Sequence, residues 1–190
     1  MKLFEGKKVL AIGAHPDDIE LHCAGTFLKY DMELLTLVMS KGGRREGDRL
    51  IEQKEAFNKL AVSKSIIGDF IDGYMRLDND MVHFLDDVVA DIKPDIIFTH
   101  NTVDFHQDHV VVARAVSAAT RHKPITIFRF PQSGSAFIWK AKGVLQVDIT
   151  KQLKWKNEVL DCFESQKDRV YFDTHRKSTV ESFKIDNIYL

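Results

Sequence analysis

The segment Val9–Glu20 reads VLAIGAHPDDIE. Its first five residues form an apolar run with the length of a buried strand. Pro16 forces His15 into an extended conformation, so His15 ends the strand, and Asp17 and Asp18 fall in the turn that opens a helix. Ligands of an open parallel sheet bind beyond the carboxyl ends of its strands, so an imidazole and two carboxylates meet where a site is expected. Aspartate is also favoured as a helix cap, but capping explains only one of the two.

The composition is that of an ordinary soluble protein, with 190 residues, 44% hydrophobic, 29% charged and a formal net charge of −1. We therefore expect a single domain over 1–190. The nearly balanced charge does not indicate binding to nucleic acid or to an anionic membrane. No apolar stretch is long enough to span a bilayer. Two cysteines, Cys23 and Cys162, are too few for a disulfide scaffold. Met1–Lys8 lacks the apolar core of a signal peptide, which favours a cytoplasmic protein.

Apolar runs and helical patterns alternate along the rest of the chain. Strands are predicted over 9–13, 34–39, 65–67, 96–99, 125–130 and 144–147, with a partly extended tail over 180–190. Helices are predicted over 20–30, 48–60, 81–92, 107–120 and 150–163, the third of them capped by Asp80. This alternation predicts an α/β protein with right-handed βαβ units, a Rossmann-like three-layer αβα sandwich around a mostly parallel sheet.

A second polar cluster, HNTVDFHQDH, occupies residues 100–109 after a predicted strand. His106 and His109 are three residues apart, so at a helix start they share one face. His109 can complete a site begun by His15 and Asp18, with two imidazoles, one carboxylate and a position left for water. That pattern is typical of a catalytic zinc site rather than of a closed structural one. The alternative is a polar loop with solvated histidines.

The motifs AHPDD, residues 14–18, and DFHQDH, residues 104–109, closely resemble those of the zinc-dependent N-deacetylases of the PIG-L/LmbE-like family. Members of that family remove acyl groups from N-acetylglucosamine-type sugars and related amides. Two residues depart from the family pattern, because His22 and Ala24 stand where members usually carry glycine. His22 would either narrow the pocket or cover a helix face, and we favour the second. Weaker matches extend over nearly the whole chain, at Gly25-Thr26, Arg49-Leu50-Ile51-Glu52, Thr99-His100-Asn101, Ser165-Gln166 and Glu181-Ser182-Phe183.

The resemblance implies a metal centre and a separate base. His15, Asp18 and His109 would hold one Zn²⁺ per chain, with another divalent metal such as Fe²⁺ as the alternative. Zinc lowers the pKa of its bound water towards neutrality. Asp17 would not bind the metal but would accept the proton of the attacking water and then protonate the leaving amine.

The same resemblance implies supporting roles around this centre. His106 would stabilise the oxyanion, with Asp108 orienting it through its other ring nitrogen. Asp104 would either support a metal ligand or be a plain turn carboxylate. Arg49 would bind substrate or be a surface charge of its helix. His100 would line the pocket or only steady the end of its strand.

The resemblance implies a hydrolase that removes an N-acyl group, with acetyl the first candidate, from a small-molecule amino sugar or its conjugate. A homo-oligomer is compatible with it. One alternative is another metal-dependent hydrolase such as a phosphoesterase, although a two-metal site needs more bridging carboxylates. The other is a non-catalytic metal- or sugar-binding protein on the same fold. We expect the pocket to be formed by loops that include 40–47 and 101–105. No role in the metal site is expected for His83, His122 and His175.

Overall fold

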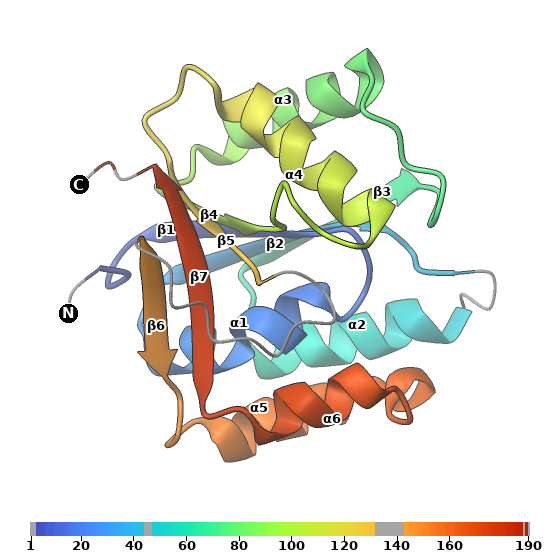
Figure 1. The fold of residues 1–190 in the computed structure, drawn as a ribbon, viewed down its shortest axis with the longest axis vertical. Helices are drawn as coiled ribbons and strands as arrows, with labels where there is room; N and C mark the ends of the chain where they lie inside the picture. The colour runs from blue at the N-terminus through green and yellow to red at the C-terminus, as the bar shows by residue number, and fades with distance from the viewer. Residues whose placement is uncertain (1–2, 44–46, 132–142, 188, 190) are drawn as a thin grey trace.

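The computed structural model describes residues 3–43, 47–131, 143–187 and 189 (Figure 1). These residues form one sheet of seven strands together with six α-helices and a short 3₁₀ turn. The strands are β1 (Lys8–Gly13), β2 (Glu33–Ser40), β3 (Lys64–Phe70), β4 (Ile96–Thr99), β5 (Thr126–Arg129), β6 (Val144–Asp148) and β7 (Val180–Asn187). The helices are α1 (Asp18–Lys29), α2 (Gly47–Lys59), α3 (Asn79–Ile92), α4 (Gln107–Thr120), α5 (Leu153–Leu160) and α6 (Val170–Lys177).

The strand order is β3-β2-β1-β4-β5-β7-β6, and the first five strands in this order run parallel. β7 is antiparallel to both of its neighbours, β5 and β6. Helices α3 and α4 cover one face of the sheet and α1, α2, α5 and α6 cover the other (Figure 1). The predicted three-layer sandwich with a mostly parallel sheet is confirmed. The chain leaves β1 towards β2 and later returns to its other side as β4, so the carboxyl ends of β1 and β4 flank the switch point where ligands bind.

The central strand β1 is apolar along its length because both of its faces are covered. Val9 and Ala11 pack into the core beneath α1, whereas Leu10 and Ile12 pack into the core beneath α3 and α4. Aromatic rings fill much of the first core, including Phe98, which stacks on Phe128 with ring centroids 5.0 Å apart.

Small shifts of one or two residues aside, the helices differ from the prediction in the cap of α3, the length of α5 and the presence of α6. Asp78 rather than Asp80 caps α3, because its side chain accepts the backbone N–H of Met81 at 3.0 Å. α5 is shorter than the predicted helix over 150–163. α6 was not predicted, since Phe172 is its only buried residue and its sequence lacks an apolar stripe.

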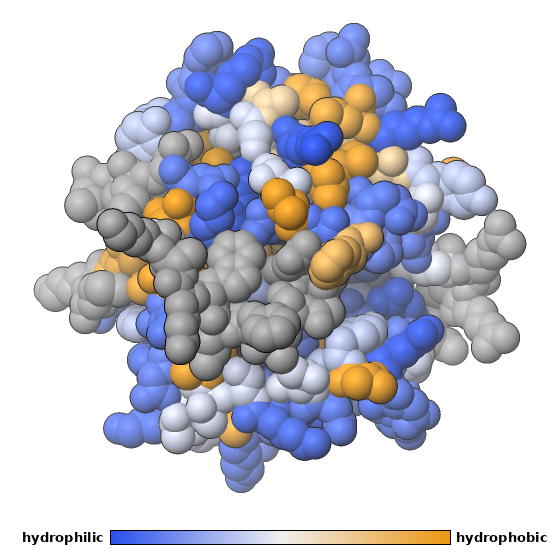
Figure 2. All heavy atoms as spheres, viewed as in Figure 1, coloured by the Kyte–Doolittle hydropathy of each residue, from blue (hydrophilic) through white to orange (hydrophobic). Residues whose placement is uncertain are grey.

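The surface of the described part mixes polar and apolar side chains. Apolar side chains over the α3 and α4 layer are interrupted by charged ones (Figure 2). Val103 and Phe105, in the loop before α4, are among the exposed large apolar residues. No helix in the described ranges is both long and apolar enough to cross a membrane.

A buried ion pair anchors α1 to its neighbours. Lys156 Nζ on α5 lies 2.8 Å from Glu181 Oε1 on β7. The same carboxylate accepts the backbone N–H groups of Gly25 and Thr26 at 2.9 and 2.7 Å. A Cβ atom on Gly25 would lie 2.5 Å from Cδ1 of Ile149, so this close packing requires glycine. The helix that begins with Asp18 is therefore fixed at its middle as well as at its start.

Candidate active site

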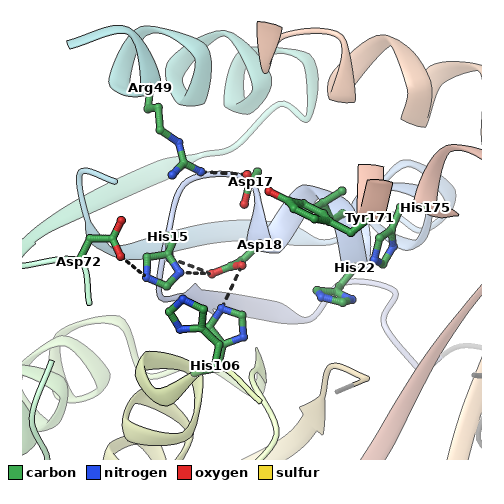
Figure 3. A pocket seen from close by; sticks show the side chains of 11 residues that line it. His15, Asp17, Asp18, His22, Arg49, Asp72, His106, Tyr171 and His175 are labelled. Carbon is green, nitrogen blue, oxygen red and sulfur yellow. Dashed lines mark hydrogen bonds and ion pairs between the residues drawn. The ribbon is translucent and has the colours of Figure 1, made fainter. Parts of the chain in front are cut away.

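The turn between β1 and α1 separates the side chains of two adjacent aspartates. Asp17 has a φ of 95°, in the left-handed region that asparagine and aspartate tolerate better than most residues. In this conformation Asp17 faces Arg49, while Asp18 faces His15 (Figure 3). Asp18 also lies beside His109. Strained backbone of this kind is concentrated at functional sites.

The three predicted metal ligands lie near one another where β1 and β4 end, although none of the groups with ligand atoms within 4.8 Å of one another contains all three. Asp18 Oδ2 is 3.6 Å from Nδ1 of His15, and Asp18 Oδ1 is 3.4 Å from Nε2 of His109. The rings of His15 and His109 have their centroids 5.4 Å apart. His106 lies against both rings, with centroid distances of 4.7 Å to His15 and 4.6 Å to His109.

The donors in this cluster fit a divalent metal. In each of three groups, every residue can offer one ligand atom within 4.8 Å of the others. Imidazole nitrogens with carboxylate oxygens suit Zn²⁺ and also Fe²⁺ or Mn²⁺. Oδ1 of Asp108 is buried and has no hydrogen-bond partner among the described residues, which leaves a lone pair for a cation. The groups are His15, His106 and His109; Asp18, His100 and His109; and His15, Asp72 and Asp108.

Three carboxylate groups lie around the His15 ring. Burial alone would lower the pKa of His15, but hydrogen bonds with Asp108, Asp18 and Asp72 outweigh it and raise the pKa to about 12. Burial also opposes the charge on His109, whose pKa rises to about 9 because Asp18 and Asp104 lie beside it. An imidazole surrounded by carboxylates in this way marks a place that favours a cation.

Asp17 lies outside these three groups and has different partners. Nη2 of Arg49, on α2, is 2.9 Å from Oδ2 of Asp17 and also donates to the carbonyl of Pro16. The backbone N–H of Asp17 donates to Oε1 of Gln53 at 3.2 Å. Burial raises the pKa of Asp17 to about 7, and the charge of Arg49 opposes that rise. In contrast, the pKa of Asp18 stays well below its ordinary value despite burial, because of His109 and His100.

His106 caps α4 with its ring, and this fixes its protonation. Nδ1 of His106 accepts the backbone N–H of Asp108 at 3.3 Å. Burial lowers the pKa of His106, and a neutral ring that accepts at Nδ1 carries its proton on Nε2. His106 therefore presents an N–H donor beside His15 and His109.

Asp108 contacts the other ring nitrogen of His106, as predicted, but through its backbone N–H, while its carboxylate has different partners. Oδ2 of Asp108 lies 3.1 Å from Nε2 of His15 and accepts the backbone N–H of Gly73 at 2.6 Å. The reason is that the backbone of Asp108 already occupies Nδ1 of His106, while its side chain, in the first turn of α4, reaches the end of β1. Asp108 therefore contacts His106 through its backbone and His15 through its carboxylate.

His100 does not reach the pocket, which corrects its predicted substrate contact. It is 1% exposed, and its Nε2 accepts the backbone N–H of Ala14 at 2.9 Å. Burial lowers the pKa of His100 to about 4, so the ring is neutral. The alternative, a hydrogen bond that joins the ends of β1 and β4, is the arrangement found. Asp104 supports the cluster from the loop, since its Oδ1 accepts the His106 backbone N–H at 2.9 Å and its Oδ2 is 3.5 Å from Nδ1 of His109.

The cluster opens into a pocket of about 320 Å³. The loops predicted to form it do not line it in their described parts, 40–43 and 101–105, while 44–46 lie outside the described residues. Asp72, which follows β3, could have been found from the strand-end rule. Two further wall residues come from the unpredicted α6 and carried no sequence signal. The lining residues are His15, Asp17, Asp18, Leu21, His22, Arg49, Asp72, His106, His109, Tyr171 and His175.

Solved structures share this fold at low sequence identity. One is the N,N'-diacetylchitobiose deacetylase from Pyrococcus horikoshii, with a TM-score of 0.79 and 18% identity, covering 98% of this chain and 86% of that one. Another is GalB, the 4-carboxy-2-hydroxymuconate hydratase from Pseudomonas putida KT2440, with a TM-score of 0.75 and 17% identity over 97% of each chain. Proteins with this fold are described with more than one activity, and at these identities the likeness shows the fold alone.

Comparison of the sequence with known proteins identifies the family more specifically than the fold does. The uncharacterized deacetylase YaiS from Escherichia coli (strain K12) is 34% identical over 130 residues, which is 62% of this chain and 70% of that protein. The family model PIG-L, described as GlcNAc-PI de-N-acetylase, matches residues 10–120, a range that holds both the His15 and His109 motifs. By its sequence and by the clustered residues that carry these motifs, the chain belongs to the PIG-L family.

Proposed function

We propose that this chain is a metal-dependent N-deacetylase that hydrolyses the N-acetyl amide of an amino sugar or its conjugate. The observation that carries the proposal is the division between two adjacent carboxylates. Asp18 joins His15 and His109, whereas Asp17 lies in the same pocket and pairs with Arg49. A site that only bound a metal would not need the second buried carboxylate.

His15, Asp18 and His109 would hold the metal, and zinc is the first candidate because mixed His and Asp ligands suit it. When bound, such a metal supplies a Lewis acid that polarises the amide carbonyl and makes water a stronger nucleophile near neutral pH. The role of the protein is to place a proton acceptor and a hydrogen-bond donor beside the reacting carbonyl.

Asp17 would be the proton acceptor. A base works best when its pKa lies near the working pH, and burial places the pKa of Asp17 at about 7. As water adds to the carbonyl carbon, one of its protons passes to a carboxylate oxygen of Asp17. The same proton then passes to the amide nitrogen as the carbon–nitrogen bond breaks, which releases a free amine and acetate.

His106 would stabilise the charge that develops on the carbonyl oxygen. Its Nδ1 is occupied by the backbone N–H of Asp108, so the proton of the neutral ring is on Nε2. A fixed donor of this kind lowers the barrier because it needs no reorientation during the reaction.

The substrate class rests on the relatives and on the pocket. The family model is named for de-N-acetylation of GlcNAc-PI, and the similar Pyrococcus structure is that of an N,N'-diacetylchitobiose deacetylase. A pocket of about 320 Å³ is at the small end of ligand sites, a size suited to one sugar ring.

Acetate release from N-acetylglucosamine and N,N'-diacetylchitobiose tests this function. We expect equal amounts of acetate and free amine, loss of release after removal of metal with a chelator, and recovery with Zn²⁺ or Fe²⁺. Phosphate release from p-nitrophenyl phosphate without acetate release would favour a phosphoesterase. Hydration of 4-carboxy-2-hydroxymuconate would favour a hydratase, and sugar binding without turnover would favour a binding protein.

A further inference from the structure

His22 lies in the pocket wall with an unsatisfied polar atom. The residue is 8% exposed and lines the pocket beside Leu21. Its Nδ1 is buried and has no hydrogen-bond partner among the described residues. Buried polar atoms are almost always paired, so an unpaired one in a pocket wall calls for a partner that the described residues do not supply.

The position of His22 relates it directly to the proposed reaction centre. His22 follows Asp18 by four residues on α1, and residues with this spacing lie on one face of a helix with Cβ atoms roughly 5–6 Å apart. Figure 3 shows both side chains on the same wall, with His22 further from His15 than Asp18 is. A substrate with its acyl group at Asp18 would therefore bring its next polar group to His22.

The surroundings of His22 hold its ring in one orientation. One face stacks on Phe130, with centroids 5.0 Å apart and planes 15° apart. His175 from α6 meets the ring edge-on, with centroids 4.8 Å apart and planes 89° apart. A ring fixed by packing loses little freedom when it binds, which suits a residue that selects a ligand.

Both imidazoles at this end of the pocket are neutral. Burial, helped by the neighbouring His175, holds the pKa of His22 well below its ordinary value. Burial likewise lowers the pKa of His175 to about 3. A neutral ring nitrogen is a donor or an acceptor without charge, and a hydroxyl group, which is both, can pair with either form.

Resting on the proposed function, we propose that His22 is a specificity residue whose Nδ1 hydrogen-bonds an uncharged hydroxyl on the sugar ring of the substrate. The carboxylate and guanidinium groups that line the pocket lie toward the reaction centre, whereas the wall formed by His22 and His175 carries none; these groups belong to Asp17, Asp18, Arg49 and Asp72. This end therefore selects a hydroxylated neutral ring over a bare hydrocarbon ring of the same size.

The test compares two N-acetyl amides carried on six-membered rings, one hydroxylated and one a bare hydrocarbon. N-acetylglucosamine and N-acetylcyclohexylamine are titrated into the metal-loaded protein carrying Asp17→Asn, which should slow turnover about 10²–10⁴-fold, with and without His22→Phe. Phenylalanine keeps the stacking on Phe130 but removes both nitrogens. His83→Phe, at an exposed position on α3, is the matched control, and thermal unfolding checks that each variant folds.

We expect His22→Phe to weaken binding of N-acetylglucosamine about 5- to 10-fold, the effect of one net hydrogen bond, and to leave N-acetylcyclohexylamine unchanged. His22→Asn should recover part of the loss, because its amide atoms are bonded to Cγ as Nδ1 is. In the parent protein, the ¹⁵N shift of His22 Nδ1 should move with the sugar and not with the cyclohexyl amide.

Equal loss for both ligands, no loss for either, or no preference of the parent protein for the hydroxylated ring would overturn the assignment. Failure of the proposed function is a separate result. In that case the wild-type protein would release no acetate, while the preference for the sugar and its dependence on His22 would persist.

Discussion

Nη2 of Arg49 lies 2.9 Å from Oδ2 of Asp17, although the two residues are 32 positions apart and belong to different elements. Both side chains are largely withdrawn from solvent, at 14% and 5% exposed. Such a pair interacts more strongly than one at the surface, because less water screens it. Arg49 therefore stabilises the charged form of the proposed base, in addition to any contact with substrate.

Replacing Arg49 should change the pH dependence of the reaction. Without its guanidinium the pKa of Asp17 rises further above its ordinary value, because burial is then opposed by less positive charge. The base is active when deprotonated, so the acidic limb of kcat/KM in Arg49→Met should move to higher pH. Activity should fall most at low pH and recover at high pH.

The measurement for this variant is the full pH profile of kcat/KM with one substrate. Arg114→Met, at an exposed position on α4, is the control and should leave the profile where it is. An unmoved acidic limb with a raised KM would instead make Arg49 a substrate contact, as the sequence alone suggested.

Asp108→Asn should lower the affinity for the metal rather than disturb the N–H group that His106 donates. Oδ2 of Asp108 contacts Nε2 of His15, and replacing a partner of a metal ligand typically costs about 10–100-fold in metal affinity. We expect this loss in competition with a chelating dye, with kcat largely kept at saturating metal. An unchanged metal affinity with a fall in kcat would contradict this role and make the Asp108 side chain act through His106 instead.

The Lys156–Glu181 pair should be important for stability. Lys156→Met leaves a buried carboxylate without its cation, and breaking a buried pair in this way costs about 3–5 kcal/mol. Urea unfolding should show a lower midpoint with an unchanged slope. Lys177→Met, which removes an exposed pair with Asp173 on α6, is the control and should have little effect. Equal midpoints for the two variants would contradict the anchoring of α1 by this pair.

The fold could be predicted because its signals are local. The apolar run that forms β1 and the Pro16 turn fix where the strand ends, and the alternation of elements fixes the layers. The same local rule placed His15 and His109 at neighbouring strand ends. It could not show which partner a side chain selects, so the contact of the Asp108 carboxylate with His15 was missed.

The pocket wall was harder to predict because it depends on tertiary packing. α6 buries only Phe172 and has no periodic pattern, yet it brings Tyr171 and His175 to the pocket. His22 was expected to cover a helix face, and only the fold shows that this face of α1 lines the pocket. The proposed roles of the site residues, the identity of the metal and a cytoplasmic location stay predictions.

The central claim is that Asp18 holds the metal and Asp17 moves the proton. Asp17→Asn is the suitable variant, because asparagine tolerates the φ of 95° at this position and lacks only the charge. Asp18→Ala removes a ligand, so it should lose both metal and activity.

The most direct measurement is metal content and kcat on the same preparations of the Asp17→Asn and Asp18→Ala proteins. Asp17→Asn should keep one equivalent of metal and lose about 10²–10⁴-fold in kcat, the contribution of a positioned general base. An Asp17→Asn protein that lost its metal while Asp18→Ala kept it would reverse the two roles. An Asp17→Asn protein with both metal and full activity would contradict the mechanism.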